Sequence, residues 1–233
     1  MKKIALFVIL AIIITSFSFL PADCSSLLFF KEGSQSTMTS YNSDGKLIGT
    51  TKTSYTKVTK TTNGATVSAT QENYDKKGKL STTSNYTIKC DKGTLYFDLK
   101  MMMPDQQAEA YKDFEMVVEG AEKEMPSDLV VGNNLKDAHV NFTFKTKEGN
   151  EMPMMKMSVK ISNRKIEAKE NITTPAGTYE CYKITEDVEI KTMFTIKVKS
   201  INWFNPNVGT VKTESYKENG KYTGKTELTE LKK

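Results

Sequence analysis

The segment from Ile172 to Ile184 reads I-T-T-P-A-G-T-Y-E-C-Y-K-I, and it contains the most explicit turn of the chain, Thr174 to Gly177. Proline presets φ for the second position of a tight turn, and glycine suits a position that needs φ > 0. Both flanks are strand-like. We therefore predict a long hairpin formed by 154–170 and 177–190, against which the other strands pair.

Side chains alternate between the two faces of a strand. Tyr182 and Ile184 therefore share one face of this hairpin, and Tyr179 and Cys181 share the other. The pattern predicts either that both faces are covered or that a bulge realigns the strand. In both cases we expect the hairpin near the centre of the sheet. No histidine accompanies Cys181, so the hairpin is interpreted as a folding element and not as a nucleophile site.

The first residues have the layout of a secretory signal peptide. Two lysines precede an apolar run from Ile4 to Leu20, and the small residue Ala22 precedes a polar stretch. We predict a signal peptide over 1–22, cleaved after Ala22, and a single β-rich domain over 23–233.

Two alternatives compete with cleavage. A retained anchor is an alternative because the apolar run reaches the lower limit for a membrane span, but the break at Pro21 and the abrupt change to polar residues after it favour cleavage. Lipidation of Cys24 is disfavoured because Asp23 occupies the position where lipoprotein processing requires a small residue. The sequence thus predicts an exported protein (periplasmic, outer-membrane associated or secreted) with no stable membrane span after cleavage.

The charge of the chain is mildly positive and dispersed. The formal net charge is +5, and removal of the two lysines of the signal peptide lowers it to +3. A nucleic-acid partner would require a basic stripe or a known motif, so none is expected. Arg164 is the only arginine. Because arginine is best suited to bidentate capture of phosphate or carboxylate, no such site is expected either.

Three cysteines are present: Cys24, Cys90 and Cys181. An oxidising compartment favours one disulfide, and three pairings are possible. We favour Cys24 with Cys90, because Cys24 is close to the new N-terminus and Cys90 borders a turn. Cys181 lies within a strand and is expected to be a buried free thiol.

Threonine, serine, tyrosine and valine alternate through most of the chain, as is typical of half-buried strands. The first group of predicted strands is 35–42, 46–60, 64–75, 79–90 and 94–100. The second group is 139–147, 154–170, 177–190, 193–204, 208–217 and 221–231.

One turn recurs, with the pattern tyrosine, three polar residues, glycine and lysine. It occupies 41–46, 74–79 and 216–221. A type I turn closed by glycine in the left-handed region, with an adjacent G1 bulge, has this chemistry. We interpret the repeat as a favoured hairpin design and not as a sugar-binding aromatic motif.

The segment 101–137 differs from its surroundings. Asp105 to Phe114 contains helix-forming residues, follows a proline and begins with an acid, which predicts one short helix. The remainder of the segment is interpreted as a linker between the two groups of strands.

Motifs that carry catalysis are missing from the sequence. His139 is the only histidine, whereas catalytic triads, zinc sites and histidine general bases need more partners. No phosphate-binding glycine pattern or nucleophile elbow occurs. A carboxylate pair of the glycosidase kind could form among the 28 acidic residues, but none stands out. We expect no enzymatic activity, no cofactor and no metal site.

Nine of the twelve methionines lie between Met101 and Met157. Thioether clusters can hold Cu(I), and flexible methionines can line an apolar groove for a lipid, a peptide or a protein partner. Core filling beside the predicted helix is the third interpretation and the one with the most weight. The candidate groove consists of Met101, Met102, Met103, Met152, Met154, Met155 and Met157.

Several features follow one another in a fixed order along the chain: Cys24, the repeated Tyr-x-x-x-Gly-Lys hairpin, the Met-Pro segment before the predicted helix, Leu129 to Gly132, Ile172 to Ile184, and Trp203 to Lys212. This order resembles the TapB-like family of secreted, uncharacterised Bacteroidetes proteins, across essentially the whole chain after the signal peptide. The resemblance implies an envelope or secreted β protein of the open half-barrel kind that wraps a helix, and it supplies no catalytic residues.

We therefore expect a mainly β, antiparallel fold: a strongly curved sheet or open half-barrel with one short helix packed against it. The expected function is that of an exported, non-catalytic cell-envelope protein that binds an apolar ligand, a lipid, or a peptide or envelope-protein partner. An envelope hydrolase with unidentified carboxylates and a purely structural surface protein are the alternatives. A deep apolar cavity would favour binding, and two facing desolvated carboxylates would favour hydrolysis. Long exposed strand edges without a cavity would favour the structural role.

Overall fold

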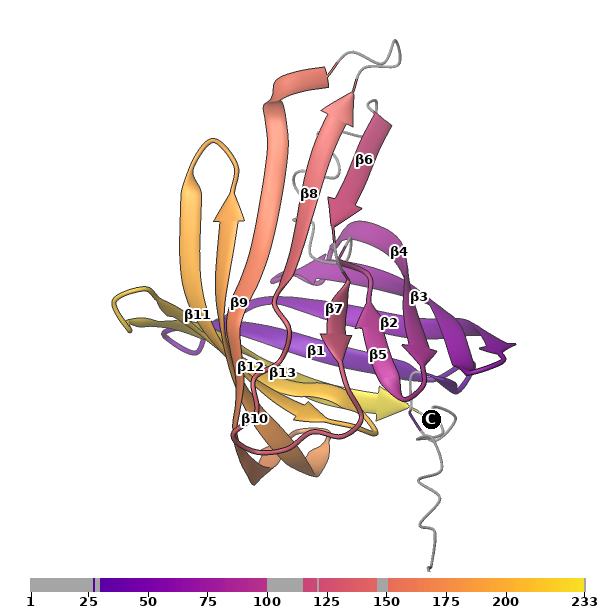
Figure 1. The fold of residues 1–233 in the computed structure, drawn as a ribbon. Helices are drawn as coiled ribbons and strands as arrows, with labels where there is room; N and C mark the ends of the chain where they lie inside the picture. The colour runs from indigo at the N-terminus through magenta and orange to yellow at the C-terminus, as the bar shows by residue number, and fades with distance from the viewer. Residues whose placement is uncertain (1–26, 28–29, 100–114, 121, 146–150, 233) are drawn as a thin grey trace, which may run out of the picture.

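Thirteen strands form a single antiparallel sheet in the order β6-β8-β9-β10-β11-β12-β13-β1-β2-β3-β4-β5-β7 (Figure 1). The computed structural model describes residues 27, 30–99, 115–120, 122–145 and 151–232. The predicted mainly β, antiparallel class is confirmed, and each predicted strand has a counterpart in the sheet. The strands are β1 (Gln35–Asn42), β2 (Leu47–Thr61), β3 (Gly64–Asp75), β4 (Leu80–Asp91), β5 (Thr94–Phe97), β6 (Glu115–Gly120), β7 (Lys123–Met125), β8 (Ala138–Lys145), β9 (Glu151–Thr174), β10 (Gly177–Lys191), β11 (Thr195–Asn205), β12 (Gly209–Lys217) and β13 (Tyr222–Lys232).

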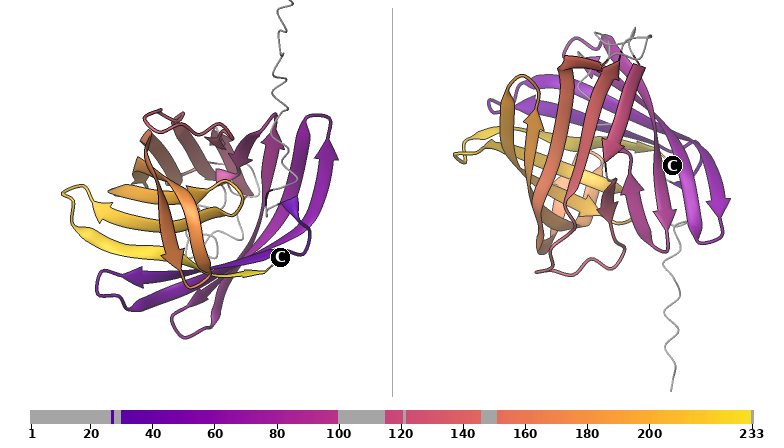
Figure 2. Two further views of the ribbon diagram at one scale, coloured as in Figure 1. Left: turned by 90° about the horizontal axis from the view of Figure 1, so that it is seen from below. Right: turned by 45° about the horizontal axis from the view of Figure 1, so that its top comes forward.

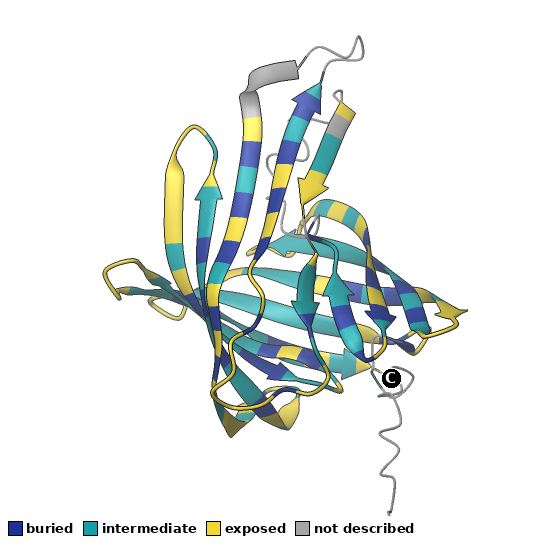
Figure 3. Cartoon of the chain, in the orientation of Figure 1, coloured by how far each residue is buried: buried dark blue, intermediate teal, exposed yellow. Residues whose placement is uncertain are grey.

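Alternation of buried and exposed residues gives the sheet an apolar inner face and a polar outer face. In β8, Val140, Phe142 and Phe144 are buried, and the residues between them are exposed or half-buried. Figure 3 shows the same alternation along β8 and β9. This is the pattern of an antiparallel sheet with one face on the core.

The two edges of the sheet are formed by strands that are consecutive in the chain. β6 pairs only with β8, and β7 pairs only with β5, among the described strands. Gly120 ends one edge strand and Lys123 begins the other, and the two residues are three positions apart. Their Cα atoms can therefore be at most about 10 Å apart, which brings the two edges close together. The sheet therefore curls strongly yet remains open, and Figure 2 shows β1–β4 and β8–β11 curving around a common interior.

The prediction for 101–137 needs correction. Its C-terminal part, interpreted as a linker, contains the edge strands β6 and β7, which are short and are defined by pairing with distant strands. The helix predicted for 105–114 lies outside the described residues, and no α-helix occurs within them, so the helix packed against the sheet is not confirmed. None of the described helical segments has the length or apolarity needed to cross a membrane. The predicted signal peptide, 1–22, also lies outside the described residues.

The recurring turn has the predicted geometry at all three places. Gly45, Gly78 and Gly220 have φ of 74°, 77° and 82°. Each turn is preceded by a register shift at its tyrosine, which is Tyr41, Tyr74 or Tyr216. The left-handed glycine and the neighbouring bulge were both predicted from the Tyr-x-x-x-Gly-Lys pattern, and both are confirmed.

The hairpin of β9 and β10 is formed as predicted, with Gly177 at φ 134°. Tyr182 and Ile184 pack in one apolar cluster, and Tyr179 and Cys181 pack in another, so the alternative in which both faces are covered is the one realised. The register shift between Lys183 and Ile184 skips a residue of β9 and leaves the alternation of β10 unchanged. The expected central position was wrong, because β9 and β10 are the third and fourth strands from one edge. The middle strand of the sheet is β13, because β13 and β1 pair and join the two groups of strands.

Apolar side chains fill the interior in two clusters. One joins the two halves of the curled sheet, with Tyr55 and Ile88 from one half and Ile166, Ile184 and Phe204 from the other. The second lies beneath β8 and β9 and contains Phe142 and Val159. A third, smaller cluster contains Cys181, Trp203 and Val211.

Candidate functional site

The predicted methionine groove can be placed only in part. Met101, Met102 and Met103 lie outside the described residues. Met152, Met154 and Met155 belong to β9, but their side chains are outside the description. Met157 is 4% exposed and packs with Phe142, Val140 and Ile161. Met157 therefore acts as a core residue, and the groove as a whole stays a prediction.

A different hollow lies on the inner face of the strands that surround β1. Strand pairing places Met38 of β1 beside Thr51 of β2 and Leu228 of β13, and their side chains line a cavity of about 150 Å³. We call it the concave pocket. Its lining residues are Ser36, Met38, Thr51, Thr53, Tyr55, Gln71, Tyr86, Ile88, Phe97, Val208, Thr210 and Leu228.

The concave pocket is neutral. Its lining combines apolar and aromatic side chains with hydroxyl groups and one amide, and none of the described lining residues carries a charge. Tyr55 and Tyr86 are the two ionisable groups. Burial raises the pKa of Tyr86 to about 12 and raises the pKa of Tyr55 above its usual range, so both stay protonated. A charged ligand group would find no counter-ion there.

The polar groups beside the concave pocket satisfy one another. Thr51 Oγ1 donates to Asn73 Oδ1 at 2.8 Å, and Asn73 Nδ2 donates to Thr82 Oγ1 at 3.2 Å. Across β1 and β13, the hydroxyls of Ser40 and Thr226 lie 2.8 Å apart. A ligand in the pocket would therefore meet few unpaired polar groups, which favours apolar contact over ion pairing.

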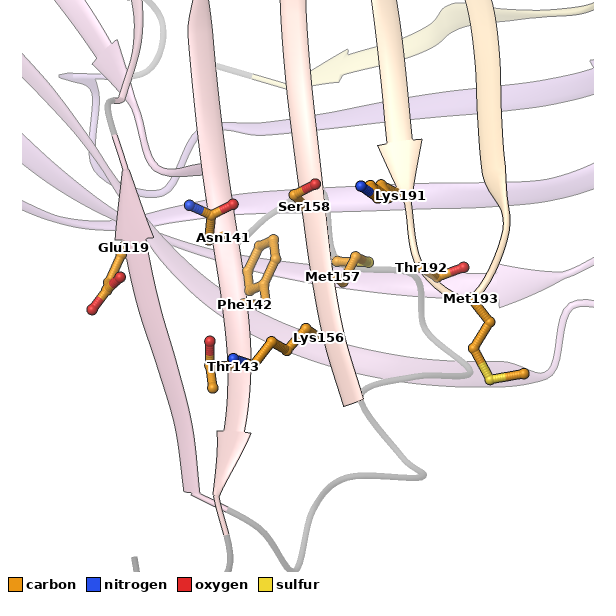
Figure 4. A pocket seen from close by; sticks show the side chains of 10 residues that line it. All are labelled: Glu119, Asn141, Phe142, Thr143, Lys156, Met157, Ser158, Lys191, Thr192 and Met193. Atoms are coloured by element: carbon orange, nitrogen blue, oxygen red, sulfur yellow. The ribbon is translucent and has the colours of Figure 1, made fainter. Parts of the chain in front are cut away.

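A larger and more polar hollow lies on the outer face. We call it the outer groove, and its volume is about 460 Å³. Strand pairing aligns Glu119, Asn141, Ser158 and Lys191 across β6, β8, β9 and β10, and Figure 4 shows their side chains with Met193 at the hairpin beyond. The full lining is Glu119, Asn141, Phe142, Thr143, Lys156, Met157, Ser158, Lys191, Thr192 and Met193.

A buried charged cluster on the inner face was not foreseen. Arg164 is 1% exposed, and its Nε lies 3.4 Å from Glu186 Oε2. Lys123 Nζ lies 2.9 Å from Glu186 Oε1, which also accepts a hydrogen bond from Asn202 Nδ2 at 2.9 Å. Burial lowers the pKa of Arg164 and of Lys123, and the charge of Glu186 opposes this effect.

The cluster fastens the segment 126–137, which joins β7 to β8 and which we call the crossing segment, to the sheet. Arg164 Nη1 donates to the carbonyl oxygen of Lys136 at 2.6 Å, and Nη2 donates to that of Glu124 at 3.0 Å. Leu135 N donates to the Arg164 carbonyl oxygen at 2.8 Å. The inference that the lone arginine argues against carboxylate capture was therefore wrong in one respect: it captures a carboxylate of its own chain. The only indication of this role in the sequence was that Arg164 lies in a predicted strand whose residues were expected to alternate between buried and exposed.

This cluster does not have the arrangement of a hydrolase. Glu186 is the only buried carboxylate among the described residues, and it faces two cations and an amide instead of a second carboxylate. Glycosidase chemistry needs two carboxyl groups across a cleft. His139 is exposed, and the described part of the chain contains no cluster of three histidine, cysteine or carboxylate side chains that could hold a metal.

The cysteines are placed in part. Cys90 is disulfide-bonded and Cys181 is a buried free thiol. Cys24 lies outside the described residues, so the pairing of Cys24 with Cys90 stays a prediction.

Cys181 is expected to be inert in the native protein. Burial, together with the charges of Glu170 and Glu180, raises the pKa of its thiol to about 11. The thiolate is the reactive form, so at pH 8 we expect no labelling by Ellman's reagent in the folded protein and one equivalent after unfolding without reductant. Rapid labelling of the native protein would contradict the described burial.

These features define a class: an open, strongly curled antiparallel sheet with a neutral pocket on its inner face and without a recognisable catalytic centre in its described part. The chain belongs to the DUF3108-like family, whose model matches residues 31–228. The TapB-like assignment is not confirmed. No curated protein matches the chain.

Two solved structures share the fold. A candidate exported protein with a YmcC-like fold from Bacteroides fragilis is 22% identical, with a TM-score of 0.72 over 87% of this chain and 97% of that chain. A candidate lipoprotein from Parabacteroides distasonis is 23% identical, with a TM-score of 0.71 over 90% of this chain and 100% of that chain. The curled open sheet is thus a shared architecture, and neither description names a catalytic activity.

Proposed function

We propose that the protein is an exported, non-catalytic cell-envelope protein that binds an uncharged apolar chain in the concave pocket. The signal-peptide pattern of 1–22 supports export. The descriptions of the two structures that share the fold, as a candidate exported protein and a candidate lipoprotein, support the same location.

The neutrality of the concave pocket is the observation that carries the proposal. Pockets for whole drug-sized ligands measure roughly 300–1,000 Å³, whereas an apolar cavity of about 150 Å³ accepts a benzene-sized group. The concave pocket, at about 150 Å³, therefore suits one segment of a chain, such as the acyl portion of a lipid or an apolar peptide side chain. Its hydroxyl-bearing residues suit a neutral polar group at the end of that segment.

Filling the concave pocket is expected to weaken binding. We predict that Met38→Trp weakens the binding of 1-octanol by about tenfold or more, because the indole occupies the space that the chain would enter. Thr50→Trp is the matched control: it adds the same ring on the outer face of β2, one residue from Thr51, and should change binding less than about twofold. Isothermal titration calorimetry provides the measurement.

The charge of the ligand provides a second readout. Octanoate has the same chain length as octanol, and we expect it to bind more weakly because its carboxylate would be desolvated without a cation. Native mass spectrometry of protein purified from its own envelope then identifies the natural ligand. Equal binding of octanol by Met38→Trp and Thr50→Trp would exclude the concave pocket. Absence of any bound chain in both experiments would favour the structural alternative.

A further inference from the structure

The turn between β10 and β11 exposes a cluster of large apolar side chains. Met193 is 69% exposed, Phe194 is 74% exposed and Ile196 is 54% exposed. Single exposed apolar residues are ordinary on a soluble protein, whereas a contiguous group of them marks an interaction surface. We call Lys191–Lys197 the β10–β11 tip.

The backbone of the β10–β11 tip is internally hydrogen-bonded. Thr192 N donates to the Phe194 carbonyl oxygen at 2.9 Å, and Phe194 N donates to Thr192 Oγ1 at 3.4 Å. On one side the tip extends past β12, because β11 pairs with β12 only up to Val198 but pairs with β10 as far as Thr195. On its other side β9 continues beyond Ser158, the partner of Lys191. Each backbone group that is hydrogen-bonded within the turn lowers the cost of leaving water.

Lysines flank the apolar side chains. Lys191 and Lys197 bound the tip, and within the described chain Lys191 makes no ion pair, while Lys197 lies 3.6 Å from Glu218. The outer groove adjoins the tip, with Met193 as one wall and Lys156 and Lys191 on its polar side (Figure 4). Glu119 is the one acidic residue in the lining of the groove.

Exposed apolar residues and lysines also occur at the corresponding turns of neighbouring strands. Because neighbouring strands are antiparallel, the strand order places the β12–β13, β1–β2 and β3–β4 turns at the same end of the strands as the β10–β11 tip. Leu47, Ile48 and Leu80 are exposed just after two of these turns. Lysines accompany them at Lys46, Lys76, Lys77, Lys79, Lys217 and Lys221.

We propose that the β10–β11 tip inserts into the surface of an anionic lipid bilayer. Met193, Phe194 and Ile196 enter the boundary between headgroups and acyl chains, and the flanking lysines meet the lipid phosphates. The strength of interfacial binding increases with the apolar area that is buried and with the attraction of positive charges to anionic lipid. Each lysine near the surface adds a similar amount to that attraction. A protein partner fits less well, because lysine is depleted in protein–protein interfaces. This site is separate from the concave pocket.

Vesicle sedimentation tests the proposal. The full exported protein should bind vesicles of phosphatidylglycerol and phosphatidylcholine, bind pure phosphatidylcholine at least about tenfold more weakly, and lose affinity as salt rises. The double variant Met193→Ser with Phe194→Ser should bind the anionic vesicles at least about tenfold more weakly. The matched control, Val130→Ser with Val131→Ser, removes another exposed apolar pair and should bind like the unmodified protein.

A second measurement locates the tip. Phe194→Trp adds an indole to a chain whose only tryptophan, Trp203, is buried. The fluorescence of the added indole should shift to the blue with anionic vesicles and be quenched by brominated acyl chains. Lack of vesicle binding by the unmodified protein, equal loss in both double variants, or an added indole that brominated chains do not quench would each overturn the proposal. Capture of an envelope protein through Met193 and Phe194, without vesicle binding, would replace the bilayer with a protein partner.

Discussion

Arg164→Ala is expected to lower the free energy of unfolding by about 3–5 kcal/mol, the usual cost of breaking a buried ion pair by removing one partner. The guanidinium group is fully enclosed, and Glu186 is only 5% exposed. Removal of the cation leaves the Glu186 carboxylate with Lys123 as its remaining cationic partner. The carbonyl groups of Lys136 and Glu124, which accept from Arg164, also lose their donors.

The loss of stability in Arg164→Ala is expected to be accompanied by a local structural change. Lys123 lies on β7 at one edge of the sheet, and Arg164 and Glu186 lie on β9 and β10 near the other edge. The cluster therefore joins the two edges of an open sheet that no strand pairing joins in the described chain. We expect Arg164→Ala to loosen the crossing segment first, which hydrogen exchange would detect as faster exchange of Leu135 N.

Lys165→Ala is the matched control for Arg164→Ala. Lys165 is the next residue in β9, and its ion pair with Glu167 is on the surface, so its loss should cost at most about 1 kcal/mol. Urea unfolding of both variants, with the slope m compared as well as the midpoint, separates a change in stability from a change in the unfolded state. Equal stabilities of the two variants would show that the buried cluster contributes nothing particular.

Gly224→Ala is expected to destabilise the join between the first and last strands by about 2–5 kcal/mol, through overpacking and backbone strain together. A Cβ at this position would lie 2.3 Å from the carbonyl oxygen of Tyr41, and φ is +157°. Gly224 pairs with Asn42 across β13 and β1, where the backbones cannot separate without breaking the ladder. The absence of a side chain permits the close approach at a place where the sheet curls.

Gly220→Ala separates the two causes. Gly220 also has a positive φ, +82°, but a Cβ there would meet nothing within 4 Å. Alanine at 220 should therefore cost only the left-handed strain, about 1 kcal/mol. Thermal or urea unfolding of both variants checks the order, and a Gly220→Ala loss as large as that of Gly224→Ala would contradict the steric explanation.

Local chemistry accounts for the parts of this protein that its sequence determined. The left-handed glycines of the recurring turn, the Pro-Ala turn before Gly177 and the alternation within the long strands each depend on neighbours a few residues away. The burial of both faces of β10 was also indicated locally, because Cys181 and Ile184 point to opposite faces of one strand. These features predicted an antiparallel β protein and most of its strand bounds.

The tertiary structure alone decided the features that depend on distant pairing. β6 and β7 are strands because β8 and β5 offer them partners. Arg164 is part of a buried cluster because Glu186, on another strand, pairs both with it and with Lys123 of a third strand. The concave pocket likewise combines side chains from β1 through β5 with others near the end of the chain. Hydrogen bonds and ion pairs between residues far apart in the chain leave no periodicity in the sequence, so only the curled sheet could reveal them.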